Sequence, residues 1–396
     1  MTLNDPGAHR LREFGESIFD TMSRRAAAAG AINLGQGAPD EDGPAAMLER
    51  AQEEIAKGNN QYSPANGVWE LRQAIAIHQE RFYDQDVDPE SQVLVTVGAS
   101  EALAATALGL LNPGDEVIVI EPFYDAYPGI IALAGATRVA VPLKEIPGEN
   151  GSRGTWDLDA DAVREAVTNK TAMVIINNPH NPTGAVFSHA ELGKLAEVVK
   201  EHNLFVLSDE VYEHLTYDGV QHTPFATLPG MWNHTVTVSS AAKSFNATGW
   251  KTGWAVGPEN LIRQAGRAKQ FLSFAGNTPV QPAVAYALNY EMRWVDELNR
   301  TLDARRKKLI EALAECGLQP RDCFGTYFVL VEAPQEFADG MALNDYLTDK
   351  LGVTGIPVSA FADHPGVWDR YLRFGFCKSH DTLDEALVRL KNTSVS

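Results

Sequence analysis

Short apolar runs alternate with helix-like segments through the middle of the chain, from about residue 90 to residue 257. The runs have the length and the Val and Ile content of buried strands, and they lie at 92–97, 116–122, 137–143, 171–179, 204–209, 235–240 and 253–257. Between two of them, Ser188 and Glu191 form a capping box for a helix with one apolar face, and a helix from Ser100 is apolar on nearly every side. This alternation predicts a mostly parallel sheet covered by helices on both faces, an α/β fold.

The pattern changes after Pro282. A long amphipathic helix is followed by an apolar strand at 326–332, a helix near 342–351, a strand at 371–376 and a helix from Asp381. This order is typical of a smaller α+β unit. We therefore expect three parts, which are an N-terminal segment over 1–45 that packs with the small domain, a large domain over 46–284, and the small domain over 285–396.

The composition excludes several kinds of partner. Lys and Arg number 33 and Asp and Glu number 52, so the formal net charge is −19 and the average field repels nucleic acid and anionic membranes. No run approaches the ~18 apolar residues of a membrane span, and the polar N-terminus has no secretory signal pattern. The three cysteines, Cys316, Cys323 and Cys377, form neither a disulfide framework nor a metal-ligand spacing. We therefore expect a cytoplasmic protein without a metal site.

Polar residues follow several of the predicted strands. Asn181 lies in "NNPHNPTG", Asp209 and Tyr212 lie in "SDEVYEHL", and Lys243 lies in "SSAAKSFNATGWKTGW". Each has an ordinary interpretation by itself, as a turn residue, a helix N-cap, a packed aromatic and a solvated lysine. Ligands of parallel sheets, however, bind beyond the carboxyl ends of the strands, where all four residues would meet. An amine among small and apolar neighbours is also a candidate nucleophile, because burial lowers the pKa of a lysine.

In this order, the three motifs resemble those of the class I aminotransferases, which belong to the fold-type I superfamily of enzymes dependent on pyridoxal phosphate (PLP). The resemblance extends from "INLGQGAPD" to "LRFGFCKSHDTLDEAL", nearly the whole chain. The segments "NLGQGAPDEDGP", "EPFYDAY" and "LRFGFCK" are similar to the branch that contains kynurenine aminotransferases, cysteine-conjugate β-lyases and N-succinyldiaminopimelate aminotransferases. The resemblance implies a large PLP-binding domain with a mostly parallel sheet, a smaller α+β domain, and ping-pong transfer of an amino group between an amino acid and a 2-oxo acid.

The resemblance also implies a role for each motif residue. Lys243 would form the Schiff base with PLP and then carry a proton between the substrate Cα and the cofactor. Asp209 would pair with the protonated pyridine nitrogen and keep the ring an electron sink. Tyr212 and Asn181 would hydrogen-bond the ring oxygen. Tyr124 in "EPFYDAY" would stack on the ring, although core filling is its ordinary interpretation.

The phosphate of PLP needs a cradle of its own. Ala99 and Ser100 lie at a helix start, where free N–H groups and the helix dipole favour an anion. By resemblance, Ser240 and Lys251 supply the remaining contacts, with a lysine where many relatives carry arginine. Tyr62 in "NNQYSPANG" matches a residue that reaches the phosphate of the partner subunit in the family, which implies a homodimer with shared sites.

Substrate recognition is expected at Arg373 in "YLRFGF". A guanidinium matches a carboxylate with two parallel hydrogen bonds, and a charge within an apolar strand is costly without a partner. By resemblance, Asn181 and the backbone of Gly37 complete the pocket. The overall likeness to this branch implies N-succinyl-LL-2,6-diaminopimelate with 2-oxoglutarate or glutamate, in lysine biosynthesis, as the leading substrate pair. Kynurenine transamination and cysteine-S-conjugate β-elimination remain open, because we find no residue that separates them.

Other classes of protein fit the sequence less well. A nicotinamide-dependent oxidoreductase needs a GxGxxG turn, and "GQGAPD" has the first two glycines but the wrong sequel. "TGWKTGW" lacks the spacing of a P-loop, and the chain has no GxSxG motif of a serine hydrolase. A non-catalytic regulator built on the PLP fold would need a basic DNA-binding domain, for which the first 45 residues leave no room.

Overall fold

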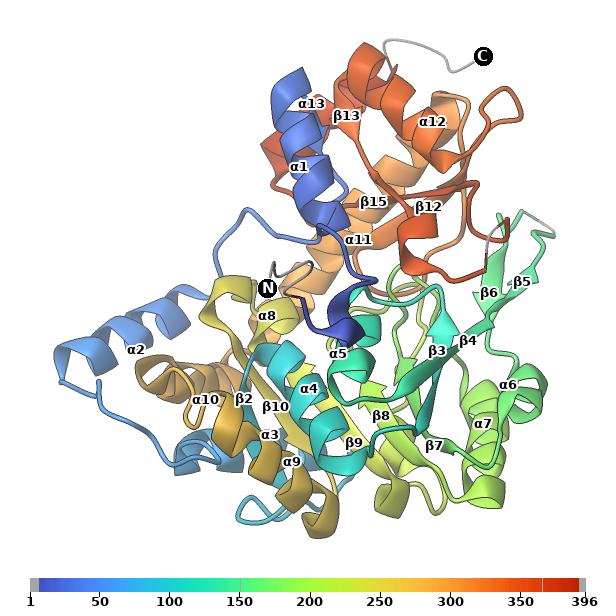
Figure 1. Ribbon diagram of the computed structural model, residues 1–396. Helices are drawn as coiled ribbons and strands as arrows, with labels where there is room; N and C mark the ends of the chain where they lie inside the picture. The colour runs from blue at the N-terminus through green and yellow to red at the C-terminus, as the bar shows by residue number, and fades with distance from the viewer. Residues whose placement is uncertain (1–6, 150, 365, 392–396) are drawn as a thin grey trace, which may run out of the picture.

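A computed structural model of the chain describes residues 7–149, 151–364 and 366–391. Its largest element is a seven-stranded sheet in the order β2-β10-β9-β8-β7-β3-β4 (Figure 1). The strands are β2 (Val93–Val97), β3 (Glu116–Glu121), β4 (Thr137–Pro142), β7 (Thr171–Asn177), β8 (Phe205–Asp209), β9 (Thr235–Ser240) and β10 (Thr252–Val256). Neighbouring strands are parallel, except that β10 runs antiparallel to β2 and β9. The predicted mostly parallel sheet is therefore confirmed.

Helices cover both faces of this sheet because its strands are apolar on both sides. The covering helices are α2 (Ala45–Ala56), α3 (Trp69–Tyr83), α4 (Gly98–Leu110), α5 (Ala126–Leu133), α6 (Ala160–Ala166), α7 (His189–His202), α9 (Glu259–Leu272) and α10 (Gln281–Tyr290). Successive residues of β3 point to opposite faces: Val117 and Val119 pack with α4, α5 and α9, whereas Ile118 and Ile120 pack with α6 and α7. The helix expected from Ser100 begins two residues earlier, and the capping box of α7 is present.

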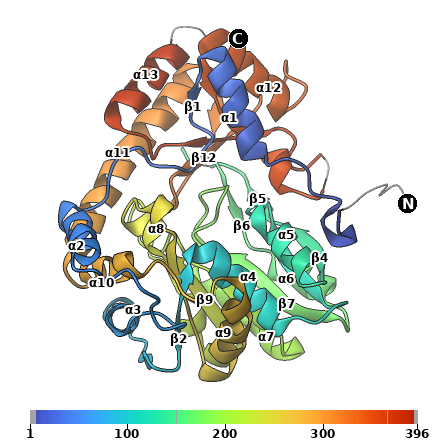
Figure 2. The same cartoon turned by 60° about the vertical axis from the view of Figure 1, so that its left-hand side comes forward.

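A second sheet has four antiparallel strands in the order β11-β12-β15-β14. Its elements are β11 (Gln319–Pro320), β12 (Phe328–Glu332), β14 (Ile356–Pro357), β15 (Tyr371–Gly375) and the helices α11 (Met292–Glu315), α12 (Gly340–Tyr346) and α13 (His380–Lys391). Figure 2 shows strand β12 in the part of the molecule that also holds α11, α12 and α13. The three helices and the sheet share one hydrophobic core. The helix expected near 342–351 divides into α12 and a π-helical turn, Leu347–Leu351. The expected α+β character is present, and the domain boundaries stay a prediction.

The N-terminal segment packs beside the second sheet and then crosses to the first. In Figure 1, α1 (Ile18–Ala29) lies next to the C-terminal elements, and β1 (Ile32–Asn33) pairs in parallel with β13 (Val353–Thr354). The chain then passes Gly37 and Ala38, whose carbonyls accept hydrogen bonds from Tyr327 and Lys378, before it enters α2. This crossing places Gly37 beside the carboxyl edge of the large sheet, where the site lies.

The remaining elements are short. They are the hairpin β5 (Lys144–Ile146) with β6 (Thr155–Asp157), the helix α8 (Ala241–Ser244), and the 3₁₀ turns His9–Leu11, Phe225–Thr227, Trp232–His234, Thr248–Trp250, Thr278–Val280 and Val358–Phe361. Within the described ranges, no helix combines the length and the apolar character that crossing a membrane requires.

Candidate active site

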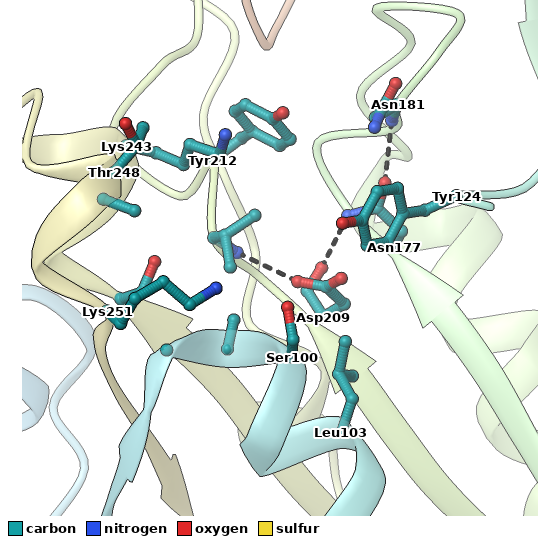
Figure 3. A pocket seen from close by; sticks show the side chains of 15 residues that line it. Ser100, Leu103, Tyr124, Asn177, Asn181, Asp209, Tyr212, Lys243, Thr248 and Lys251 are labelled. Carbon is teal, nitrogen blue, oxygen red and sulfur yellow. Dashed lines mark hydrogen bonds between the residues drawn. The ribbon is translucent and has the colours of Figure 1, made fainter. Parts of the chain in front are cut away.

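A cavity of about 170 Å³ lies at the carboxyl ends of β7, β8 and β9, beside the first turn of α4 (Figure 3). Apart from Tyr62, every residue predicted to contact PLP lines this cavity: Ala99, Ser100, Tyr124, Asn181, Asp209, Tyr212, Ser240, Lys243 and Lys251. Lys243 and Lys251 approach from one side, and Asp209 and Tyr124 from the other (Figure 3). Residues that are far apart in the sequence therefore form one polar pocket.

Lys243 lies in α8, directly after β9, and its ammonium is surrounded by aromatic rings. Its Nζ donates a hydrogen bond of 2.7 Å to Oη of Tyr327 and lies 5.6 Å from the centre of the Tyr212 ring. Desolvation lowers the pKa of Lys243 to about 8, and the nearby cations Arg373 and Lys251 act in the same direction. The amine is therefore partly deprotonated near neutral pH, as a nucleophile or proton carrier requires.

Asp209 ends β8 as a buried carboxyl without a cationic side chain bonded to it. Oη of Tyr127 donates a hydrogen bond of 2.7 Å to Oδ2, and the Val211 N–H lies 3.4 Å from Oδ1. Burial raises the pKa of Asp209 to about 6, although both hydrogen bonds oppose this shift. Among the ion pairs of the described residues, none includes Asp209. A positively charged group of a ligand would supply the cationic partner that this carboxylate lacks.

The first turn of α4 forms the anion-binding side of the cavity. Gly98 has a φ of +71°, and a Cβ at this position would stand 3.2 Å from Nζ of Lys251. The ammonium of Lys251 thus lies against the helix start, where Ala99 and Ser100 line the cavity and the N–H groups of a first turn have no partner within the helix. A cation and a helix N-terminus together favour a phosphate or a carboxylate.

Arg373 lies in β15 and faces a second cavity of about 250 Å³ next to the first. Its side chain is 1% exposed, Nη1 donates to Oδ1 of Asn181 at 2.8 Å, and Nη2 donates to the carbonyl of Gly35 at 2.6 Å. The guanidinium lies 3.9 Å above the ring of Phe328, and Nε has no partner. Burial lowers the pKa of Arg373 to about 10, so the group is still charged at neutral pH. No ion pair of the described part of the chain includes it.

The two cavities share one wall. Tyr124, Asn181, Tyr212 and Lys243 line both, and Gly37 lines the second. A Cβ at Gly37 would stand 2.5 Å from Cζ of Phe328, so only glycine fits this approach. A molecule in the second cavity would therefore touch Arg373 at one end and Lys243 at the other.

Tyr62 lies outside both cavities of its own chain. Its side chain is 85% exposed, and its ring contacts the edge of Phe274 at 5.6 Å between centroids. A role of Tyr62 in a site therefore needs a second subunit, in line with the family resemblance of its motif.

Several residues of the site were missed from the sequence. Asn177 bridges two predicted residues, because Nδ2 donates to the carbonyl of Asp209 and Oδ1 accepts the N–H of Asn181. Tyr127 and Tyr327 hold Asp209 and Lys243, and Thr248 lines the first cavity. Asn177 and Tyr127 could have been predicted as site residues, because they lie within the motifs "NNPHNPTG" and "EPFYDAY". Tyr327 could not, because it reaches Lys243 from the segment that directly precedes β12.

Known proteins share this architecture along the whole chain. Residues 29–390 match the family described as aminotransferase class I and II. A probable N-succinyldiaminopimelate aminotransferase of Mycobacterium tuberculosis is 51% identical over 390 residues, which are 96% of this chain and 97% of that protein. A kynurenine–oxoglutarate transaminase of Dictyostelium discoideum is 37% identical over 427 residues, 99% of this chain and 98% of that protein.

A solved structure gives the same result for the fold. The structure of N-succinyldiaminopimelate aminotransferase from Mycobacterium tuberculosis has a TM-score of 0.93 and 51% identity, over 98% of this chain and 99% of that chain. The chain belongs to the class I and II aminotransferase family, and it is an aminotransferase with the fold-type I architecture. The family and the fold class predicted from the sequence are confirmed.

Proposed function

We propose that the cofactor is pyridoxal phosphate and that it occupies the first cavity. The observation that carries this proposal is the arrangement of Lys243, Asp209 and Lys251 around one space. An aldehyde, a basic ring nitrogen and a phosphate are the three groups that an amine, a buried carboxyl and a cation at a helix start would select. Asp209 is buried without a cationic partner, and the protonated ring nitrogen of this cofactor would be that partner.

Each residue of the cavity has a definite task in this proposal. When bound, PLP supplies an aldehyde that condenses with amines and a protonated ring that draws electrons from the substrate Cα. Lys243 holds the aldehyde, Asp209 holds the ring nitrogen, and Tyr124 covers a face of the ring. Tyr212 and Asn181 would hydrogen-bond the ring oxygen of PLP. The phosphate would be bound by Ala99, Ser100, Ser240 and Lys251.

Lys243 is also the group that moves the proton at the substrate Cα. A pKa of about 8 leaves both protonation states populated near neutral pH, so the same amine can take the proton and return it. Tyr327 orients the amine through its hydroxyl and is itself held by the carbonyl of Gly37. Transfer of this proton from Cα to the cofactor would allow water to release the 2-oxo acid, while the amino group would stay on the cofactor until a second 2-oxo acid takes it.

The second cavity takes the substrate carboxylate. Arg373 is buried, charged and without a carboxylate partner, and its side chain is held between Asn181 and Gly35. The carboxylate of an amino acid or a 2-oxo acid would complete it with charge-assisted hydrogen bonds. Phe328 covers one face of the guanidinium.

For the substrate we propose N-succinyl-LL-2,6-diaminopimelate, with 2-oxoglutarate as amino acceptor. The support is the 51% identity to a relative named for this substrate, against 37% to one named for kynurenine. Kynurenine transamination and cysteine-S-conjugate β-elimination are the alternatives. We further propose a homodimer that acts on small molecules in the cytoplasm, supported by the exposed Tyr62 and by the lack of a disulfide among the described cysteines.

A panel of amino donors tests this function. N-succinyl-LL-2,6-diaminopimelate, kynurenine and a cysteine S-conjugate are each incubated with the enzyme and 2-oxoglutarate, and glutamate and pyruvate are measured. We expect the succinylated donor to form glutamate with a kcat/KM more than about tenfold above that of kynurenine. Faster glutamate formation from kynurenine, or pyruvate release from the conjugate as the main reaction, would establish the corresponding alternative.

A further inference from the structure

A second group of ligand-type side chains lies outside both cavities. His78 comes from α3, and Glu213 and His214 come from the segment after β8 that also carries Tyr212. Nε2 of His78 and Nε2 of His214 are 2.7 Å apart, and one ligand atom from each of the three residues lies within 4.8 Å of the others. The mechanism proposed above uses none of these three residues.

The carboxylate of Glu213 is already oriented by hydroxyl groups. Oγ of Ser239 donates to Oε1, and Oη of Tyr83 donates to Oε2. Each oxygen keeps a further lone pair after these bonds. Among the described residues, no lysine or arginine forms an ion pair with Glu213, although its side chain is 6% exposed. A buried carboxylate of this kind is stabilised by a cation between it and its neighbours.

The amide of Gln79 completes the surroundings of His78. Its Oε1 is buried and has no hydrogen-bond partner in the described part of the chain, whereas Nε2 lies 3.4 Å from Nδ1 of His78. A half-turn of the amide places Oε1 against Nδ1, where it accepts the Nδ1–H. This tautomer leaves the lone pair of Nε2 directed at His214. Metal-binding histidines are commonly held in this way through their second nitrogen.

The two imidazoles are suited to bind a metal ion. Their Nε2 atoms face each other across 2.7 Å, and His78 is only 3% exposed. The ring of Phe82 contacts both imidazoles at 4.8 and 5.0 Å between centroids, and it is 38% exposed. A partly exposed side chain therefore packs on both rings, and the site lies close to the surface.

We propose that Nε2 of His78, Nε2 of His214 and a carboxylate oxygen of Glu213 bind a divalent transition-metal ion, zinc being the probe of choice. Two imidazoles and one carboxylate are zinc-type ligands and are unsuited to Mg²⁺ or Ca²⁺, which prefer oxygen. Ligands about 2.1 Å from a tetrahedral ion stand about 3.4 Å apart, so the two rings separate slightly on binding. Because His78 and His214 are 136 positions apart, no short spacing in the sequence reveals this site. The ion would join α3 to the segment that carries Tyr212.

Zinc content measures this proposal directly. The holoenzyme is treated with a chelator, dialysed, loaded with zinc chloride, passed through a desalting column and analysed by mass spectrometry of the metal. We expect about one zinc ion per chain in the wild type, and less than about a tenth of that in His78→Gln and in Glu213→Gln. His202→Ala, which removes an imidazole beside the surface carboxylate of Glu201, is the matched control and should keep the wild-type content.

Two outcomes would overturn the proposal. A wild-type enzyme that retains no zinc after desalting has no such site, whatever the variants do. If folded His78→Gln retains as much zinc as the wild type, the metal binds at another site and His78 is not a ligand. Cobalt(II) gives an independent readout, because a four-coordinate site produces an intense visible absorption that Glu213→Gln should lose.

Discussion

Nη1 of Arg373 donates a hydrogen bond of 2.8 Å to Oδ1 of Asn181, and this bond joins β15 of the four-stranded sheet to the loop after β7 of the seven-stranded sheet. Asn181 also lines the cavity that we assign to the cofactor. The arginine that we propose for substrate binding therefore directly contacts the cavity that we propose for the cofactor. Binding of a carboxylate to Arg373 would therefore affect side chains from both sheets.

Replacement of Arg373 tests its role in substrate binding. Each charge-assisted hydrogen bond contributes roughly 1.5–3 kcal/mol, so Arg373→Ala should lower kcat/KM by about 10²–10⁴. Arg373→Lys keeps the charge but loses the planar fork, and should recover only part of this loss. The visible absorbance of the bound cofactor should remain.

The control for this experiment is Arg321→Lys. Arg321 is largely buried like Arg373, but it already pairs with Glu145 and Glu332 outside both cavities. Its replacement should leave kcat/KM nearly unchanged. A loss of less than about tenfold in Arg373→Ala, or the release of PLP by this variant, would show that Arg373 has another role.

The charge of Asp209 is expected to govern the rate of the chemical step. Asp209→Asn keeps an oxygen for the hydroxyl of Tyr127 but removes the negative charge, so kcat should fall by at least about 10²-fold. Glu210→Gln is the neighbouring control, because Glu210 is equally buried but bonds to Ser208 and His222. Steady-state kinetics of the two variants with the same donor should differ in kcat. Equal values would contradict the assignment of Asp209.

The pKa of Lys243 predicts the pH dependence of cofactor capture by the PLP-free enzyme. The pKa is lowered from 10.5 to about 8, and only the neutral amine attacks an aldehyde. The rate should therefore rise about tenfold per pH unit below pH 8 and become level above it. Stopped-flow absorbance measures this rate.

Arg373→Met tests the direction in which a nearby cation shifts the pKa of Lys243. The guanidinium lowers the pKa of Lys243, so its removal should move the midpoint to higher pH, whereas Arg321→Met should leave it in place. A wild-type midpoint near 10.5, the ordinary value for lysine, would mean that Lys243 is not desolvated in solution.

Hybrid dimers test whether Tyr62 serves the partner subunit. Tyr62→Ala should weaken retention of PLP by at least about tenfold, and Lys243→Ala should be inactive. Mixing the two variants forms hybrids in which one site has both residues. After random exchange we expect about a quarter of the wild-type activity, because half of the dimers are hybrids with one intact site. No gain over the parent variants, or a fully active monomer by light scattering, would contradict shared sites.

The features that could be predicted best from the sequence are those that depend on the periodicity of the chain. Asp209 and Ser240 end apolar strands, so their meeting at one edge results from parallel pairing, and Ser188 with Glu191 specifies a local cap. Tyr327 directly precedes the apolar strand β12 and looks like any core aromatic in the sequence, and only its hydrogen bonds to Lys243 and to the carbonyl of Gly37 give its hydroxyl a role.

Long-range contacts account for the other omissions. The parallel pairing of β1 with β13 joins two-residue strands, which are too short for any periodicity to mark. His78 and His214 likewise become neighbours only because α3 packs against the segment after β8. The positive φ of Gly98 is a local feature that favours glycine, whereas the close approach of Lys251, which directly precedes β10, is a long-range contact. Contacts of this kind depend on tertiary packing and leave little trace in a single sequence.

The central claim is that Lys243 carries PLP in the cavity between Asp209 and Lys251, and reductive trapping tests it most directly. The resting enzyme is treated with borohydride, which fixes an aldehyde–lysine linkage, and the digested protein is mapped by mass spectrometry. We predict about one cofactor per chain, attached to the peptide that contains Lys243 and to its Nζ. Attachment to Lys251 or to another lysine, or recovery of every lysine peptide without the cofactor, would contradict the account.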